Sequence, residues 1–206
     1  DAAEIAEERL QQQTAQTMRA TYSPIDLSPQ DTLSYRLFDY QAENSAMLFP
    51  FRENGYIFDQ MNGAQSQLPA FLINIHSVAD ADQAADYVSR IEGLGAVLDT
   101  LIAESRERAA KGVMPPDWVY PYVISDIENL LEDRRENAIL EDFRGKVDKL
   151  DLGEAQSGAL IARSETAWSQ SARPAYQRLL AEMQRQQTMA PTDDGIWRFD
   201  DGAAYY

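Results

Sequence analysis

Residues 80–111 read DADQAADYVSRIEGLGAVLDTLIAESRERAAK, and they carry the strongest structural signal in the chain. Asp80 and Gln83 have the spacing of a helix-capping pair. Gly112 and Pro115 follow the stretch and stop the helix. The apolar side chains between these signals recur at helical spacing, and they are Tyr87, Val88, Ile91, Leu94, Leu98, Leu101 and Ile102. The pattern predicts one long helix that is buried along one side.

Towards the N-terminus, the pattern predicts two more long helices and a short buried one. Ser28 suits the N-cap of the second long helix, and Pro29 suits its first position. The three helices are expected over residues 2–21, 28–48 and 68–75. The expected buried stripe of the second consists of Leu33, Leu37, Tyr40, Met47 and Leu48. Residues 49–68 mix aromatics with Pro, Asn and Gly, which predicts an ordered aromatic-rich loop.

Towards the C-terminus, helices are expected from residue 116, around 139–150 and over 153–187. Pro174 lies inside the last of these and predicts a kink or break, because it lacks a backbone donor. Residues 190–206 are turn-rich and irregular, with two Asp-Asp-Gly turns. The whole chain is therefore expected to be all-α, a multi-helix bundle-like array that forms a single domain or lobe over residues 1–206.

The composition excludes several classes of partner. The chain has 206 residues, 44% of them hydrophobic, and a net charge of -16 with a pI near 4.3. Nucleic-acid binding needs clustered Lys and Arg, and an anionic membrane surface repels such an acidic chain. No apolar run approaches the roughly 20 residues that span a bilayer. The absence of cysteine excludes disulfides, thiolate metal sites and cysteine nucleophiles.

The chain also lacks a complete set of catalytic or metal-binding residues. His76 is its one histidine, whereas a zinc hydrolase needs at least three ligands. Because His76 follows an apolar run at the end of a predicted buried helix, a structural role is expected. The aspartates of the turns Asp193-Asp194-Gly195 and Asp200-Asp201-Gly202 do not have the alternating spacing of an EF-hand, so turn formation is preferred over calcium binding. A solvated helix face is expected for Glu132, Asp133, Glu136, Glu141 and Asp142.

The aromatic residues near the C-terminus leave two interpretations open. Trp197, Tyr205 and Tyr206 could line a ligand cleft, or they could belong to the core of a continuation beyond Tyr206. The sequence ends on Ala-Ala-Tyr-Tyr directly after a turn, and it begins at Asp1 rather than Met. We therefore expect residues 190–206 to lead into a missing continuation of a larger protein.

Several local signatures resemble the bacterial family known as domain of unknown function 885. They are LSPQDTLSYRLF at 27–38, QMNG at 60–63, LPAFL at 68–72 with His76, DYVSRI at 86–91, PAY at 174–176, GIWR at 195–198 and DGAAYY at 201–206. Where the family often has Pro-Asp-Gly, this chain has Asp200-Asp201-Gly202. The resemblance implies the N-terminal helical portion of a zinc metallopeptidase-like protein, whose His-Glu-x-x-x-Gly-His-type metal motif lies later in the chain.

On this resemblance, the chain is a non-catalytic wall of a peptide-binding cleft, and its partner is the C-terminal catalytic part of the same protein. Zinc is expected in that missing part, and no cofactor is expected in this segment. The candidate cleft residues are Trp197, Tyr205, Tyr206, Gln60 and His76. Many relatives are exported, which favours a periplasmic location, with the cytoplasm as the alternative. The alternative function is a free-standing helical interaction module of the cell envelope with no enzyme activity.

Overall fold

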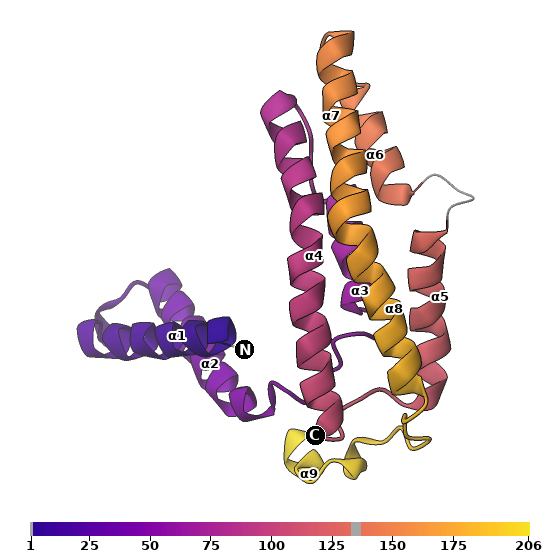
Figure 1. Ribbon diagram of the computed structural model, residues 1–206. Coiled ribbons are helices and arrows are strands. Elements are labelled where there is room, and N and C mark those ends of the chain that lie inside the picture. Colours follow the sequence, from indigo (N-terminus) through magenta and orange to yellow (C-terminus); the bar gives the residue numbers. More distant parts are fainter. Residues whose placement is uncertain (1, 133–136) are drawn as a thin grey trace. The chain divides into compact units, whose positions relative to one another are not determined.

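The computed structural model describes residues 2–132 and 137–206, and this part of the chain is all-α, without a β-strand (Figure 1). The all-α prediction is therefore confirmed. By its contacts the chain divides into two compact units. The first comprises residues 1–55 and 201–206, and the second comprises residues 56–200.

The first unit is built on an antiparallel helical hairpin. Helix α1 (Ala2–Thr21) and helix α2 (Pro29–Leu48) are joined through a 3-10 turn at Pro24–Asp26. The Ser28 hydroxyl accepts the Asp31 backbone N–H at 3.2 Å, which confirms the predicted cap. Ala15 and Ala42 are the buried residues of these two helices, so the hairpin packs closely through small side chains.

The side of α2 that faces α1 is not the side predicted to be buried. Ala42 is fully buried, its carbonyl accepts from the Gln12 side chain at 2.8 Å, and Asp39 pairs with Arg19 at 2.6 Å. The predicted stripe lies on the opposite side of α2. Its members are exposed, namely Leu33 by 61%, Leu37 by 54%, Tyr40 by 65%, Met47 by 63% and Leu48 by 47%. The prediction of a buried stripe is thus wrong within this unit.

The end of the chain completes the first unit. A 3-10 turn at Phe49–Phe51 follows α2, and the short helix α9 (Gly202–Tyr205) packs beside it. The rings of Phe51 and Tyr205 lie 5.7 Å apart between centroids. The Asn54 amide also donates to both carboxylate oxygens of Asp201, at 3.1 and 3.2 Å. Residues 201–206 are therefore held by the first unit.

Helix α4 (Ala81–Ala110) is the long central helix of the second unit. The Asp80 side chain accepts the Gln83 backbone N–H at 2.8 Å, as predicted from their spacing. All the predicted apolar positions of α4 are buried, except Leu101, which is partly buried. After the helix, Gly112 adopts φ +81°, a conformation that disfavours every side chain and ends the helix.

The other helices of this unit pack on α4 or on one another (Figure 1). Helices α7 (Glu154–Ala167) and α8 (Arg173–Gln187) form one rod that runs alongside α4. Helix α5 (Tyr120–Leu131) packs on α8, and helix α6 (Ala138–Val147) packs on α7. Helix α3 (Ala64–Asn74) contacts α4, α5 and α6. Short 3-10 turns lie at Asp117–Val119 and Ile196–Arg198.

The rod has the break predicted from Pro174, in the form of a π-helical segment at Trp168–Ala172. The Arg173 backbone N–H bonds to the Trp168 carbonyl, five residues earlier. This wider turn accommodates the ring of Pro174, which would clash within a regular α-helix. The Ser171 hydroxyl of the segment donates to the Glu92 carbonyl of α4 at 2.6 Å, and Gly95 of α4 allows this close approach.

Helix α3 begins at Ala64, four residues before the predicted start, so the aromatic-rich loop is shorter than expected. Pro69 lies inside the helix and has no N–H to give to the Gln65 carbonyl. The buried Tyr176 hydroxyl of α8 donates to that carbonyl instead, at 3.2 Å. A tertiary hydrogen bond therefore replaces the missing helical one and joins α3 to α8.

Candidate functional site

The single histidine lies in a polar cluster at the junction of α3 and α4. His76 is buried, and its ring packs on Tyr87 with centroids 5.0 Å apart. Arg90 donates to Nδ1, so the proton of the neutral ring resides on Nε2, which donates to the Gln83 carbonyl at 3.3 Å. Burial and then the Arg90 charge lower the pKa of His76, which favours this neutral form. Both ring nitrogens are thus engaged in joining α3 to α4.

A second set of contacts extends this cluster to α6. The Tyr87 hydroxyl donates to Asp142 at 2.8 Å, and burial followed by this hydrogen bond raises the Tyr87 pKa. Lys146 pairs with Asp142 at 2.7 Å. Its ammonium also donates to the carbonyls of Leu72 and Ile73, both at 2.9 Å, near the C-terminal end of α3. The prediction of a solvated face is therefore wrong for Asp142, which has Tyr87 and Lys146 as partners and is only 20% exposed.

The other carboxylates in that prediction lie elsewhere. Glu132 and Glu141 are exposed, which fits the predicted solvated face. Asp133 and Glu136 lie outside the described residues. Glu141 lines an open hollow of about 420 Å³ between α3, α5 and α6. Its polar walls are Gln65, Ser66, Asp126, Asn129 and Glu141.

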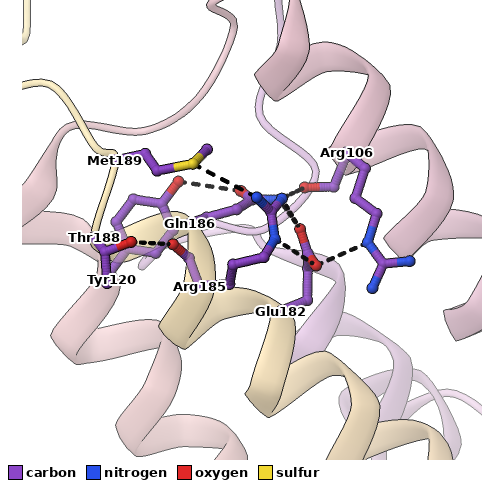
Figure 2. Close-up of polar contacts among 8 residues, drawn as sticks. Arg106, Tyr120, Glu182, Arg185, Gln186, Thr188 and Met189 are labelled. Carbon is purple, nitrogen blue, oxygen red and sulfur yellow. Dashed lines mark hydrogen bonds and ion pairs between the residues drawn. The ribbon is translucent and has the colours of Figure 1, made fainter.

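A third polar cluster joins α4, α5 and α8 (Figure 2). Its centre is Glu182, whose side chain is only 1% exposed. Arg106 donates to one carboxylate oxygen at 2.8 Å, and Arg185 and Gln186 donate to the other at 2.6 and 2.9 Å. Burial opposes ionisation of Glu182, but these hydrogen bonds outweigh it and lower its pKa to about 2. Glu182 is therefore a structural carboxylate that stays ionised.

The turn-rich segment before residue 200 belongs to the second unit and packs near Met114. Arg198 donates to the Tyr56 hydroxyl at 2.7 Å and to the Met114 carbonyl. Trp197 is 74% exposed, although its Nε1 donates to Asp193 at 3.1 Å. Asp193 also accepts the Gly195 backbone N–H at 3.2 Å, as expected for a turn-forming aspartate.

The five candidate cleft residues occupy different surroundings. Gln60 is exposed in the loop before α3, His76 is buried, and Trp197 is exposed, all in the second unit. Tyr205 packs on Phe51 in the first unit, and Tyr206 is fully exposed. Within the second unit, no described contact joins Gln60, His76 and Trp197 to one another.

Some polar residues were not found by sequence reasoning. Glu182 lies on the buried face of α8 between Leu179 and Gln186, and a charge within that stripe was a detectable signal. The residues of the hollow had no such signal, because Ser66 and Asp126 meet only through tertiary packing, at 3.0 Å. In the same hollow the side-chain oxygen of Gln65 is buried without a hydrogen-bond partner among the described residues, while its amide nitrogen donates to the Asp59 carbonyl at 2.6 Å.

Two kinds of feature were not found among the described residues. Residues 2–132 and 137–206 contain no group of three or more His, Cys, Asp or Glu side chains that could hold a metal ion. Within the same ranges, no helix has both the length and the apolar character needed to cross a membrane.

These features define a class of protein: an all-helical chain whose polar clusters join helices and whose one imidazole is fully hydrogen-bonded. Residues 1–206 match the family described as "Bacterial protein of unknown function (DUF885)", and the chain belongs to this family.

A comparison with solved structures adds a second finding. The chain is similar to a crystal structure described as "the putative lipoprotein from Colwellia psychrerythraea", with a TM-score of 0.69 and 25% sequence identity. The match covers 73% of this chain and 26% of that protein, so the chain spans a minor part of its relative's length. No curated protein matches the sequence.

Proposed function

We propose that residues 1–206 are the non-catalytic N-terminal portion of a larger zinc metallopeptidase-like hydrolase. One observation carries this proposal: the similar Colwellia psychrerythraea protein extends far beyond the region that it shares with this chain. The engagement of both His76 nitrogens in helix packing also supports it. The proposed role is to form one wall of a cleft that binds a peptide substrate, with export suggested by the relative's description as a lipoprotein.

The residues that the structure describes, 2–132 and 137–206, include no group of side chains that fits a zinc site, so we expect the metal in the remainder of the protein. There it would polarise a carbonyl and activate water. The contribution of this chain is apolar and aromatic surface. Trp197 is the strongest candidate because the residue is 74% exposed while its indole N–H donates to Asp193.

The first test is to sequence the gene beyond the codon for Tyr206 and to express the complete product. We expect a helical His-Glu motif, bound zinc and hydrolysis of peptides, whereas the polypeptide 1–206 alone should show neither zinc nor turnover. A complete protein that binds no metal and hydrolyses no peptide contradicts the proposal.

A second test addresses the cleft wall directly. In the complete enzyme, Trp197→Ala should raise KM about tenfold with kcat little changed, because an aromatic contact to bound substrate is lost. Trp118→Ala is the matched control, since Trp118 is another exposed tryptophan of the second unit. Equal effects of the two substitutions on KM would show that Trp197 does not line the cleft.

The alternative function is a helical interaction module of the cell envelope. The relative's description as a lipoprotein and the exposed apolar side of α2 favour it. A gene that stops after Tyr206, together with a partner protein bound through α2, would establish this alternative.

A further inference from the structure

Helix α2 carries an apolar seam on the side that faces away from α1. Its positions are Leu33, Leu37, Tyr40, Asn44 and Met47, separated alternately by four and three residues. This is the spacing with which one helix packs along another, and a single Asn in such a seam is a common device for fixing register. The four apolar members are each more than half exposed.

The two sides of the hairpin differ in a way that points to α2 as a middle helix. The outer side of α1 is mainly polar with a single exposed Leu10, and its threonines Thr14 and Thr17 donate to carbonyls of their own helix, at 2.8 and 2.9 Å. The α1-facing side of α2 buries Ala42, and its other side carries the seam. A helix that is packed on one side and carries apolar side chains on the opposite side is typical of a position between two neighbours.

The size of the seam indicates what kind of neighbour covers it. Each of its four apolar side chains offers roughly 100 Å² of surface, so the seam offers about 400 Å². A specific interface between separate proteins buries about 800 Å² on each partner. A second copy of this chain therefore gains too little from the seam alone, whereas a helix of the same polypeptide benefits from a high effective concentration.

We propose that the seam of α2 is the docking site for an amphipathic α-helix of the same polypeptide from outside residues 1–206. This rests on the proposed function in one respect, namely that this chain is part of a longer protein. The docked helix presents apolar side chains at the same alternating spacing, with a polar group opposite Asn44. It fixes the hairpin to the remainder of the protein.

The absence of cysteine from this chain allows a direct test by thiol labelling. Leu37→Cys places a thiol in the seam, and Gln13→Cys places a control thiol on the exposed outer side of α1. Each is made in the polypeptide 1–206 and in the complete protein, with other cysteines replaced, and labelled with a maleimide. In the complete protein, position 37 should react at least about tenfold more slowly than position 13, while in 1–206 the two rates should be similar.

Other outcomes overturn the proposal and identify a different cover. Equal labelling rates at positions 37 and 13 in the complete protein would show that no helix covers the seam. If protection of position 37 in the polypeptide 1–206 grows with protein concentration and sedimentation shows a dimer, a second copy of the chain covers the seam. Protection in 1–206 at every concentration places the cover within this chain, and a gene ending at Tyr206 excludes the proposed helix. Labelling requires neither zinc nor turnover, so a protected seam in a protein without either would refute the proposed function alone.

Discussion

At the scale of single residues, Glu182 shows how a carboxylate is kept charged inside a helical layer. Its side chain is 1% exposed, but the Arg106 and Arg185 side chains that bind it are 57% and 47% exposed. The guanidinium groups therefore keep part of their hydration while they neutralise the carboxylate. This arrangement lessens the desolvation cost that makes fully buried ion pairs weak contributors to stability.

The lowered pKa of Glu182 gives a stability contribution with a defined pH range. The group titrates near 4.5 when unperturbed and near 2 in the folded protein. Its contribution is therefore complete above about pH 4.5 and is lost as the pH falls towards 2. Glu182→Gln should lower the free energy of unfolding at pH 7 by on the order of 2 kcal/mol, and the gap to the parent should narrow below pH 4.5.

Urea unfolding between pH 3 and pH 7 measures this difference. Glu165→Gln is the control, because Glu165 pairs with Arg144 at the surface, where it is 52% exposed. Its cost should stay within about 0.5 kcal/mol. A Glu182→Gln deficit that is the same at every pH would exclude the titration of this carboxylate as its origin.

At the scale of elements, the bond from Tyr176 to Gln65 compensates for a proline within a helix. Tyr176→Phe should cost about 1–3 kcal/mol, because it leaves the buried Gln65 carbonyl without a donor. In a Pro69→Ala background the cost should be smaller, because the N–H of the new alanine reaches the same carbonyl. Chemical unfolding of the parent, both single variants and the double variant measures this coupling. Equal losses in both backgrounds would contradict it.

The helices themselves were largely predictable because their signals are local. Ser28 and Asp80 accept the cap hydrogen bonds that their spacing predicts, and Pro174 follows a widened turn. The apolar stripe of α2 was predicted as a stripe, but its burial was not. Periodicity shows which side of a helix is apolar, and only tertiary packing decides whether a neighbour covers it.

The candidate site was less predictable for a related reason. A structural role was expected for His76 from its place after an apolar run, but its partners Gln83 and Arg90 lie on the next helix, α4, and become evident only after folding. The polar hollow joins Ser66 to Asp126 across sixty residues of sequence. No local pattern marks such a pair.

At the scale of the whole molecule, the two units differ in how much apolar surface they bury. The second unit has a large core that includes Tyr87, Phe143 and Leu179, whereas α1 and α2 together bury only Ala15 and Ala42 among their described residues. Stability follows apolar burial, so the units should differ when separated.

A polypeptide of residues 56–200 should therefore be helical and unfold cooperatively, whereas residues 1–55 alone should be mostly unfolded. Far-ultraviolet circular dichroism with thermal melting measures both. A 1–55 fragment that unfolds cooperatively, or a 56–200 fragment that is unfolded, would contradict the prediction that the second unit alone folds by itself.

The π-helical segment at Trp168–Ala172 also tolerates a change in the length of the sequence. A π-turn contains one residue more than an α-turn, so deleting one residue there would restore a regular helix and leave the downstream residues on the same side. Tyr176 and Met183 would then stay buried. A homologue that is one residue shorter at this point can therefore keep the same downstream hydrophobic pattern.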